Sequence, residues 1–212
     1  MSSSLIKSID FQSTIQLVET RLRNYRPQLI QRAGVKNSAV MILFINRQNI
    51  PHLIFTKRTE WVETHKGQIS FPGGMRDSTD ADLFQTARRE TFEEIGIEPE
   101  QIQLLGQLDD FYTVTNFIVS PFVGLVTYEF RYRINEREVA KVLEVPLSLF
   151  LESTYFEVKK WPYQNRLYDV YFYHYQQEVI WGATAFMVNR FIGRVFQFNP
   201  APDPVSPESC PI

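Results

Sequence analysis

The chain has 212 residues and only one cysteine, Cys210, which lies in a proline-rich stretch near its C-terminal end. A single cysteine cannot form an internal disulfide, so the sequence fits a reducing, cytoplasmic environment and gives no basis for a catalytic thiol. No apolar run is long enough to cross a bilayer, and no charged start with an apolar core indicates a secretory signal. We therefore expect a soluble, cytoplasmic protein that does not bind membranes.

The chain also lacks an excess of positive charge, since its formal net charge is −2. This disfavours a protein that coats nucleic acid, which needs a basic surface. The hydrophobic content of 44% is enough for one substantial core in a chain of this length. We expect one domain over residues 1–198, which includes an N-terminal helix, and a disordered proline-rich tail over residues 199–212.

Apolar periodicity predicts an alternation of helices and strands. Asp10 is placed to cap an amphipathic helix that carries Phe11, Ile15, Val18 and Leu22. Strands are predicted over residues 38–45, 52–57, 102–108, 117–127 and 166–175, and helices from about residue 80 to 96, over 145–150 and over 184–196. Pro121 lies inside a predicted strand and indicates a bulge or an edge position. Strands between helices predict an α/β fold, an α/β/α sandwich with a mixed central sheet.

The most informative stretch is 71–97, a glycine turn followed by an acidic helix that ends at Gly96. At about 100° per residue, Glu90 and Glu94 lie about 40° apart on one face of this helix. Leu83 and Ala87 share that face, so the two carboxylates continue an apolar stripe and should point toward the protein. Crowded carboxylates repel each other, and a hard divalent cation such as Mg²⁺ or Mn²⁺ would relieve the repulsion.

The alternative for these acids is a solvated helix end, with Arg88 and Arg89 as ordinary ion-pair partners. Gly73 and Gly74, which precede the helix, favour the functional interpretation. Two adjacent glycines let the main chain approach a ligand closely, as phosphate and metal sites often require.

The spacing of these residues resembles the Nudix box, in which a glycine, an acid and an R-E-x-x-E-E-x-G segment follow one another. Three positions depart from that box: Asp80 is the first acid in place of glutamate, one extra residue precedes Arg89, and Thr91 takes an aliphatic position. The first two departures are similar to the coenzyme A pyrophosphatase branch, whose box commonly reads GGxxDxxDxxxxxTAxRE. The resemblance implies a Nudix-type fold and hydrolysis of a diphosphate bond.

Residue roles follow from the resemblance alone. It implies that Glu90, Glu93 and Glu94 hold Mg²⁺ or Mn²⁺, and that Arg89 orients a glutamate through a two-pronged hydrogen bond. A later N-x-x-E-V segment in this branch supplies a metal ligand or general base, which here is Glu138. The implied catalytic residues are thus Arg89, Glu93 and Glu138. An exposed loop glutamate is the alternative for Glu138.

A second resemblance concerns the substrate. The coenzyme A branch carries L-L-T-x-R-[S/A]-x3-R-x3-G-x3-F-P-G-G, and this chain matches it at Thr56, Arg58, Gly67 and the closing FPGG turn. The implied substrate-binding residues are Thr56, Arg58, Gly73 and Gly74. Glu63 replaces the second arginine and reverses its charge, which would repel an anionic substrate unless Lys57, His65 or Lys66 compensates.

The favoured hypothesis is therefore a metal-dependent diphosphatase of coenzyme A or acyl-CoA, acting on a small molecule and not on nucleic acid. A general nucleoside-diphosphate-sugar pyrophosphatase of the ADP-ribose type is the alternative, and a capped-RNA hydrolase is disfavoured because no basic stripe is present. A Nudix module that binds nucleotide without cleaving it stays open as a different class. The sequence does not give the oligomeric state, so a homodimer also stays open.

Overall fold

The computed structural model describes residues 10–61, 65–163 and 166–200. Glu63 and most of the expected tail lie outside these residues. Along the chain, the N-terminal half contains α1 (Phe11–Arg23), β1 (Lys36–Arg47), β2 (Ile50–Arg58), β3 (Ile69–Ser70), β4 (Gly73–Met75) and α2 (Leu83–Ile95). The rest contains β5 (Ile102–Gln107), β6 (Phe111–Tyr112), β7 (Phe117–Val126), β8 (Val139–Pro146), α3 (Leu147–Phe150), β9 (Phe156–Tyr163), β10 (Arg166–Tyr175), β11 (Glu178–Trp181) and α4 (Gly182–Phe196).

The main sheet is mixed. Its central path runs β3-β2-β1-β7-β5, with β4 paired to β1, β6 to β7 and β8 to β2. The β1–β7 pair is parallel, whereas β1 and β2 are antiparallel. The apolar run in β1 fits its central place, because a strand covered on both faces needs apolar side chains on both.

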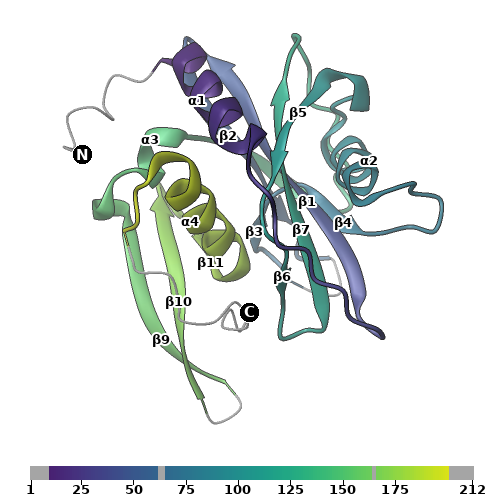
Figure 1. Ribbon diagram of the computed structural model, residues 1–212, viewed down its shortest axis with the longest axis vertical. Coiled ribbons are helices and arrows are strands. Elements are labelled where there is room, and N and C mark those ends of the chain that lie inside the picture. Colours follow the sequence, from purple (N-terminus) through teal and green to yellow (C-terminus); the bar gives the residue numbers. More distant parts are fainter. Residues whose placement is uncertain (1–9, 62–64, 164–165, 201–212) are drawn as a thin grey trace.

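Helices cover both faces of this sheet. Met41 and Leu43 of β1 pack with Ala87 of α2 in one core cluster, whereas Ile42 and Phe44 pack in a second cluster with residues of α1 and α4. Figure 1 shows α2 on one side of the main sheet and α1 with α4 on the other. The alternation of side chains along β1 therefore produces the three layers, and the predicted α/β/α sandwich is confirmed.

The helices begin and end where capping residues allow. Asp10 accepts a hydrogen bond from the Ser13 N–H at 3.0 Å, so the predicted start of α1 is confirmed. The start of α2 was expected near Asp80, but the cap is Asp82, which accepts from the Gln85 N–H at 2.7 Å. At its other end α2 stops at Gly96, with φ of 74° as predicted.

Pro121 was expected to mark a bulge or an edge position. The edge position is wrong, whereas the β5–β7 pairing does carry a register shift, between Leu104 and Gly106. Strand β7 lies between β1 and β5. The Pro121 carbonyl accepts a hydrogen bond from the Leu108 N–H at 3.0 Å. The N–H and C=O groups of a strand residue point toward the same neighbouring strand. Proline has no N–H, and the side on which that N–H would point faces the gap between the end of β5 at Gln107 and the start of β6 at Phe111. The proline therefore sits at a break between two neighbouring strands, where no ladder donor is needed.

A second, three-stranded antiparallel sheet has the order β11-β10-β9. The sequence predicted β10 with the bounds the structure shows, but it missed β9 and β11. The inner face of this sheet, with Tyr171, Tyr173 and Ile180, packs into the same core cluster as α4. None of the described helices has the length and apolar character needed to span a membrane.

Candidate active site

The acidic face of α2 turns toward the main sheet. Ala87 is fully buried and Glu94 is 3% exposed, while Glu90 is largely buried. The predicted placement of Glu90 and Glu94 on the inward face is confirmed. Glu93 lies at the rim of this face, with its side chain 52% exposed.

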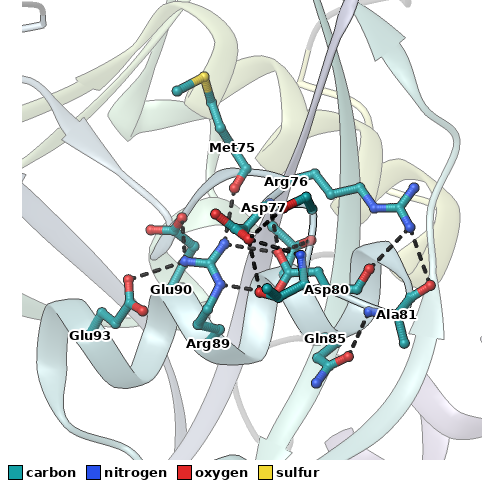
Figure 2. A network of polar contacts seen from close by, with 12 residues as sticks. Met75, Arg76, Asp77, Asp80, Ala81, Gln85, Arg89, Glu90 and Glu93 are labelled. Atoms are coloured by element: carbon teal, nitrogen blue, oxygen red, sulfur yellow. Dashed lines mark hydrogen bonds and ion pairs between the residues drawn. The ribbon is translucent and has the colours of Figure 1, made fainter.

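Arg89 is the hub of the polar contacts on this helix (Figure 2). Its Nε and Nη2 donate to the two carboxylate oxygens of Asp80 at 3.0 and 2.9 Å. Its Nη1 donates to Glu90 at 2.9 Å and to Glu93 at 3.1 Å, and its Nη2 also donates to the Met75 carbonyl at 3.0 Å. The two-pronged hydrogen bond expected on a glutamate is therefore made to Asp80, and each glutamate receives a single bond.

Asp80 joins the glycine turn to the helix. Its Oδ2 also accepts from the Thr86 hydroxyl and from the Asp77 N–H, both at 2.9 Å. Hydrogen bonds from Arg89, followed by these two, hold the pKa of the Asp80 carboxyl well below its usual value. Because this carboxylate is committed to Arg89 and Thr86, Asp82 takes over as the helix cap. Sequence reasoning missed this role of Asp80.

The two glycines of the turn bring main chain against β1 and against Glu90. Gly73 and Gly74 pair with Val40 and Ala39, and a Cβ on Gly73 would lie 2.3 Å from the Ala39 carbonyl oxygen. A Cβ on Gly74 would lie 2.5 Å from the Glu90 carboxyl carbon. Gly73 therefore excludes any side chain, because the clash is with main chain. At Gly74 the space for a side chain is the space that the Glu90 carboxylate occupies, so a side chain there would displace that carboxylate.

Glu94 is held by strand β2. The Thr56 hydroxyl donates to Glu94 Oε2 at 3.2 Å, and Thr56 itself is 1% exposed. Burial, followed by the charge of Glu90, raises the pKa of the Glu94 carboxyl to about 8, against the opposing effects of the Thr56 hydroxyl and the Arg58 charge. Burial likewise raises the pKa of Glu90. Two carboxyl groups that resist ionisation are thus placed side by side.

The loop before β8 brings Glu138 to the same place. The Asn135 N–H donates to the Glu94 carbonyl at 2.9 Å, and the Asn135 side chain donates to Glu138 Oε1 at 3.2 Å. On the other side, the Thr59 N–H donates to the Glu138 carbonyl at 2.9 Å. Burial comes first among the causes of the raised pKa of Glu90 and Glu94, and the charge of Glu138 is the smallest of these causes, which agrees with a position of Glu138 on the side of these two acids.

Strand β2 also carries Arg58, a predicted substrate-binding residue, and Lys57, which was named as a possible compensation for Glu63. Arg58 lies on the side of Thr56, and its buried Nε has no hydrogen-bond partner among the described residues. Lys57 points to the opposite face, where it forms an ion pair with Glu178 of β11 at 2.8 Å. The charge of Lys57 is therefore already paired with that of Glu178.

A model of the NUDIX domain matches residues 35–162, more than half of the chain. The chain belongs to the Nudix family. Nudix hydrolases act on diphosphate bonds, commonly with a divalent metal ion. The box of this Nudix domain is the region described above, from the glycine turn to the end of α2.

Relatives with the same family name cover most of the chain. The Uncharacterized Nudix hydrolase NudL of Enterobacter sp. (strain 638) is 35% identical over 179 residues, which cover 83% of this chain and 88% of the relative. The protein of the same name from Pectobacterium atrosepticum is 36% identical over 172 residues, which cover 81% and 89%.

Solved Nudix structures are more distant. The NUDIX domain of Shewanella oneidensis NrtR, complexed with ADP ribose, is 18% identical with a TM-score of 0.44, and the match covers 70% of this chain and 85% of that one. A C. elegans Ap4A hydrolase binary complex is 18% identical with a TM-score of 0.45, and covers 53% and 81%.

The acids of this Nudix domain suit a hard divalent cation. Glu90, Glu94 and Glu138 offer only carboxylate oxygens, the donors that Mg²⁺ and Mn²⁺ prefer. The raised pKa values of Glu90 and Glu94 reflect burial first and the charge of neighbouring carboxylates second, and a cation would favour the charged form of both groups. Among the described residues, no group of three or more histidine, cysteine, aspartate or glutamate side chains is arranged to hold an ion.

A cavity of about 300 Å³ lies on the other side of the sheet, between α4 and the segment after β5. None of the predicted site residues lines it. Its main polar groups already pair with one another, because Asp109 accepts from the Tyr25 hydroxyl and from Arg190. The chemistry of the Nudix box therefore does not extend into this cavity.

Proposed function

We propose that this Nudix protein hydrolyses the diphosphate bond of coenzyme A or an acyl-CoA. The products would be 4′-phosphopantetheine, or its acyl form, and adenosine 3′,5′-bisphosphate. One observation carries the proposal: Thr56 and Arg58, the residues that resemble the coenzyme A signature, lie on the face of β2 that meets Glu94. This placement supports a site in which the signature residues and the acids act on the same substrate.

Glu90 and Glu94, with Glu93 at the rim, would hold Mg²⁺ or Mn²⁺. The bound ion supplies neutralisation of the diphosphate oxygens and acidification of a water molecule. Arg89 keeps Glu90 and Glu93 in place through its Nη1 hydrogen bonds. Holding these acids before substrate arrives lowers the cost of reaching the reactive arrangement.

Glu138 is the residue we assign to the proton of the attacking water. It is exposed, and its carboxylate accepts only from Asn135 among the described side chains. As the water oxygen forms its bond to phosphorus, its proton passes to Glu138 and the bond to the bridging oxygen breaks. The departing phosphate then leaves with the bridging oxygen.

Arg58 is the residue we assign to the negative charge of the substrate. Its guanidinium group lies at the acidic site with a buried Nε that no described residue accepts from. Arginine binds phosphate through a planar array of donors, so a diphosphate oxygen would satisfy the unpaired group. The Gly73–Gly74 turn would let the substrate approach main chain.

The test is a substrate panel with metal titration. Purified full-length protein is incubated with coenzyme A, acetyl-CoA and ADP-ribose, with and without Mn²⁺, and the products are separated by chromatography. We expect adenosine 3′,5′-bisphosphate from the coenzyme A substrates only when the metal is present. Cleavage of ADP-ribose without cleavage of coenzyme A would refute the substrate assignment.

Cleavage of ADP-ribose alone would support a nucleoside-diphosphate-sugar pyrophosphatase. One residue of the sequence, Glu63, favours this alternative. Glu63 stands where the coenzyme A signature has an arginine, and its charge would disfavour an anionic substrate. Binding of coenzyme A and ADP-ribose without cleavage of either would instead support a non-catalytic nucleotide-binding module. The presence of all three box glutamates argues against that module.

A further inference from the structure

Thr56 lies in the interior of the main sheet. Its strand β2 is paired on both sides there, with Thr56 opposite Ser70 of β3 and opposite Val142 of β8. The side chain is 1% exposed, and its hydroxyl donates to Glu94 Oε2 at 3.2 Å. The hydroxyl has one proton to donate, so this contact uses its only donor.

The other acids of the site lack such an anchor. Glu93 is half exposed and is held by Arg89 alone among the described side chains, and Glu138 lies on an exposed loop. Glu90 is tied to Arg89, a long side chain of the same helix. Glu94 is thus the acid whose carboxylate accepts a hydrogen bond from a side chain of the sheet, the Thr56 hydroxyl.

We propose that Thr56 is a positioning residue for Glu94 and does not contact the substrate. The inference rests on the proposed role of Glu94 as a metal ligand. By holding one oxygen of the carboxylate against the sheet, the hydroxyl selects the orientation in which the carboxylate faces Glu90 and Glu138. Residues that orient a metal ligand typically change metal affinity by about 10–100-fold when they are removed.

This role departs from the one that the coenzyme A signature implies. A substrate-contacting threonine would present its hydroxyl to the surface, whereas the Thr56 hydroxyl is buried and already bonded to Glu94. Arg58, two positions along, differs from Thr56 because its buried Nε has no hydrogen-bond partner among the described residues. The two signature residues thus have different roles: Thr56 orients the metal ligand Glu94, and Arg58 binds the substrate.

The experiment compares T56V, which keeps the shape and removes the hydroxyl, with T56S, which keeps the hydroxyl. Mn²⁺ binding to the metal-free full chain is titrated by electron paramagnetic resonance of the free ion, and the variant E94Q identifies the binding event that depends on Glu94. We expect T56V to weaken that event by about 10-fold or more, and T56S to restore it. At saturating Mn²⁺, the KM for coenzyme A should stay within about twofold of wild type in T56V.

A raised KM with unchanged Mn²⁺ affinity in T56V would overturn the proposal and support a substrate contact. If T56V does not fold, T56C provides the comparison, because a thiol is a weak donor of similar size. T56C should then weaken Mn²⁺ binding, and unchanged binding would overturn the proposal. The Mn²⁺ titration needs no substrate, so it tests the role of Thr56 even if the protein does not cleave coenzyme A. If E94Q binds Mn²⁺ like wild type, the metal role of Glu94 fails instead.

Discussion

Arg89 donates two parallel hydrogen bonds, of 3.0 and 2.9 Å, to the carboxylate of Asp80, nine positions earlier in the chain. The same guanidinium group reaches Glu90 and Glu93 with its remaining Nη1 (Figure 2). The loop after the glycine turn is thereby connected to the acids of the helix through one arginine. Asp80 is nearly fully buried, so the pair is a structural link and not a solvated surface contact.

Replacing Asp80 by asparagine should therefore cost stability. The variant D80N leaves Arg89 without its main counter-charge, and we expect the free energy of unfolding to fall by about 2–3 kcal/mol, below the range for a fully buried pair because Arg89 is partly exposed. Urea denaturation of the metal-free protein measures the loss. The matched control is E100Q, because Glu100 is an exposed partner of Arg88 at 3.9 Å. E100Q should cost less than about 0.5 kcal/mol. An equal loss of unfolding free energy in D80N and E100Q would contradict a structural role for the Asp80–Arg89 pair.

The buried carboxyl of Glu94 predicts a pH-dependent stability. Its folded-state pKa is raised to about 8 from an ordinary value of 4.5. Between these values the folded protein keeps a proton that the unfolded chain releases. The stability of the metal-free protein should therefore fall as pH rises from 4.5 to 8.

Chemical denaturation at several pH values, with chelator present, measures this slope. The variant E94Q removes the titrating group and should flatten the curve over the same range. Saturating Mn²⁺ should reverse the loss in wild type, because the ion favours the charged carboxylate. An equally steep curve in E94Q would show that another group causes the slope.

The contact between Gly74 and Glu90 predicts a variant that loses function but keeps its fold. In G74A the new methyl carbon would lie 2.5 Å from the carboxyl carbon of Glu90, which is too close for both groups to keep their positions. The carboxylate is the far end of a flexible side chain, so it can move aside at low cost. We expect the free energy of unfolding to change by less than about 1 kcal/mol and turnover to fall by more than about 10-fold.

Steady-state kinetics and thermal unfolding of G74A test this expectation together. The control is M75A, which alters an exposed side chain in the same short strand and should leave turnover close to wild type. Wild-type turnover in G74A would show that the position of Glu90 matters little. A large loss of stability in G74A would show that the clash spreads into the main chain.

Local signals in the sequence were enough to predict the inward face of α2, its end at Gly96, and strand β10. Each depends on a short-range pattern: helical spacing, a left-handed glycine and alternation of side chains. Strands β9 and β11 were missed because β9 contains Lys159, Lys160 and Pro162 and β11 has four residues. Their stability comes from pairing with β10 and not from their own pattern.

Long-range contacts account for the rest. Thr56 and Glu94 are 38 positions apart, and only the pairing of β2 within the sheet brings them together. The signal available was alternation, since Thr56 lies two residues beyond Ile54, which packs with α2. Pro121 was expected at a bulge or an edge because proline usually avoids central strands, whereas here it lies in a central strand and faces a break between β5 and β6.

Glu138 and Glu136 offer a matched pair for testing the general base. Both are exposed glutamates of the loop before β8. Glu138 is the one that accepts from Asn135, whose N–H donates to the Glu94 carbonyl. After burial, the charge of Glu138 is among the causes of the raised pKa of Glu90 and Glu94. We expect E138Q to lower kcat by about 100-fold or more, as removal of a general base does, and E136Q to leave kcat near wild type. Steady-state kinetics at saturating Mn²⁺ and substrate make the comparison.

The pH profile separates the two roles that Glu138 could have. Loss of a general base should remove the acidic limb of the kcat profile, because no carboxylate then needs to be deprotonated before proton transfer. Loss of a metal ligand should instead be recovered in part by raising the Mn²⁺ concentration, with the limb retained. Equal kcat values for E138Q, E136Q and wild type would refute both roles and leave Glu138 as a solvated loop residue.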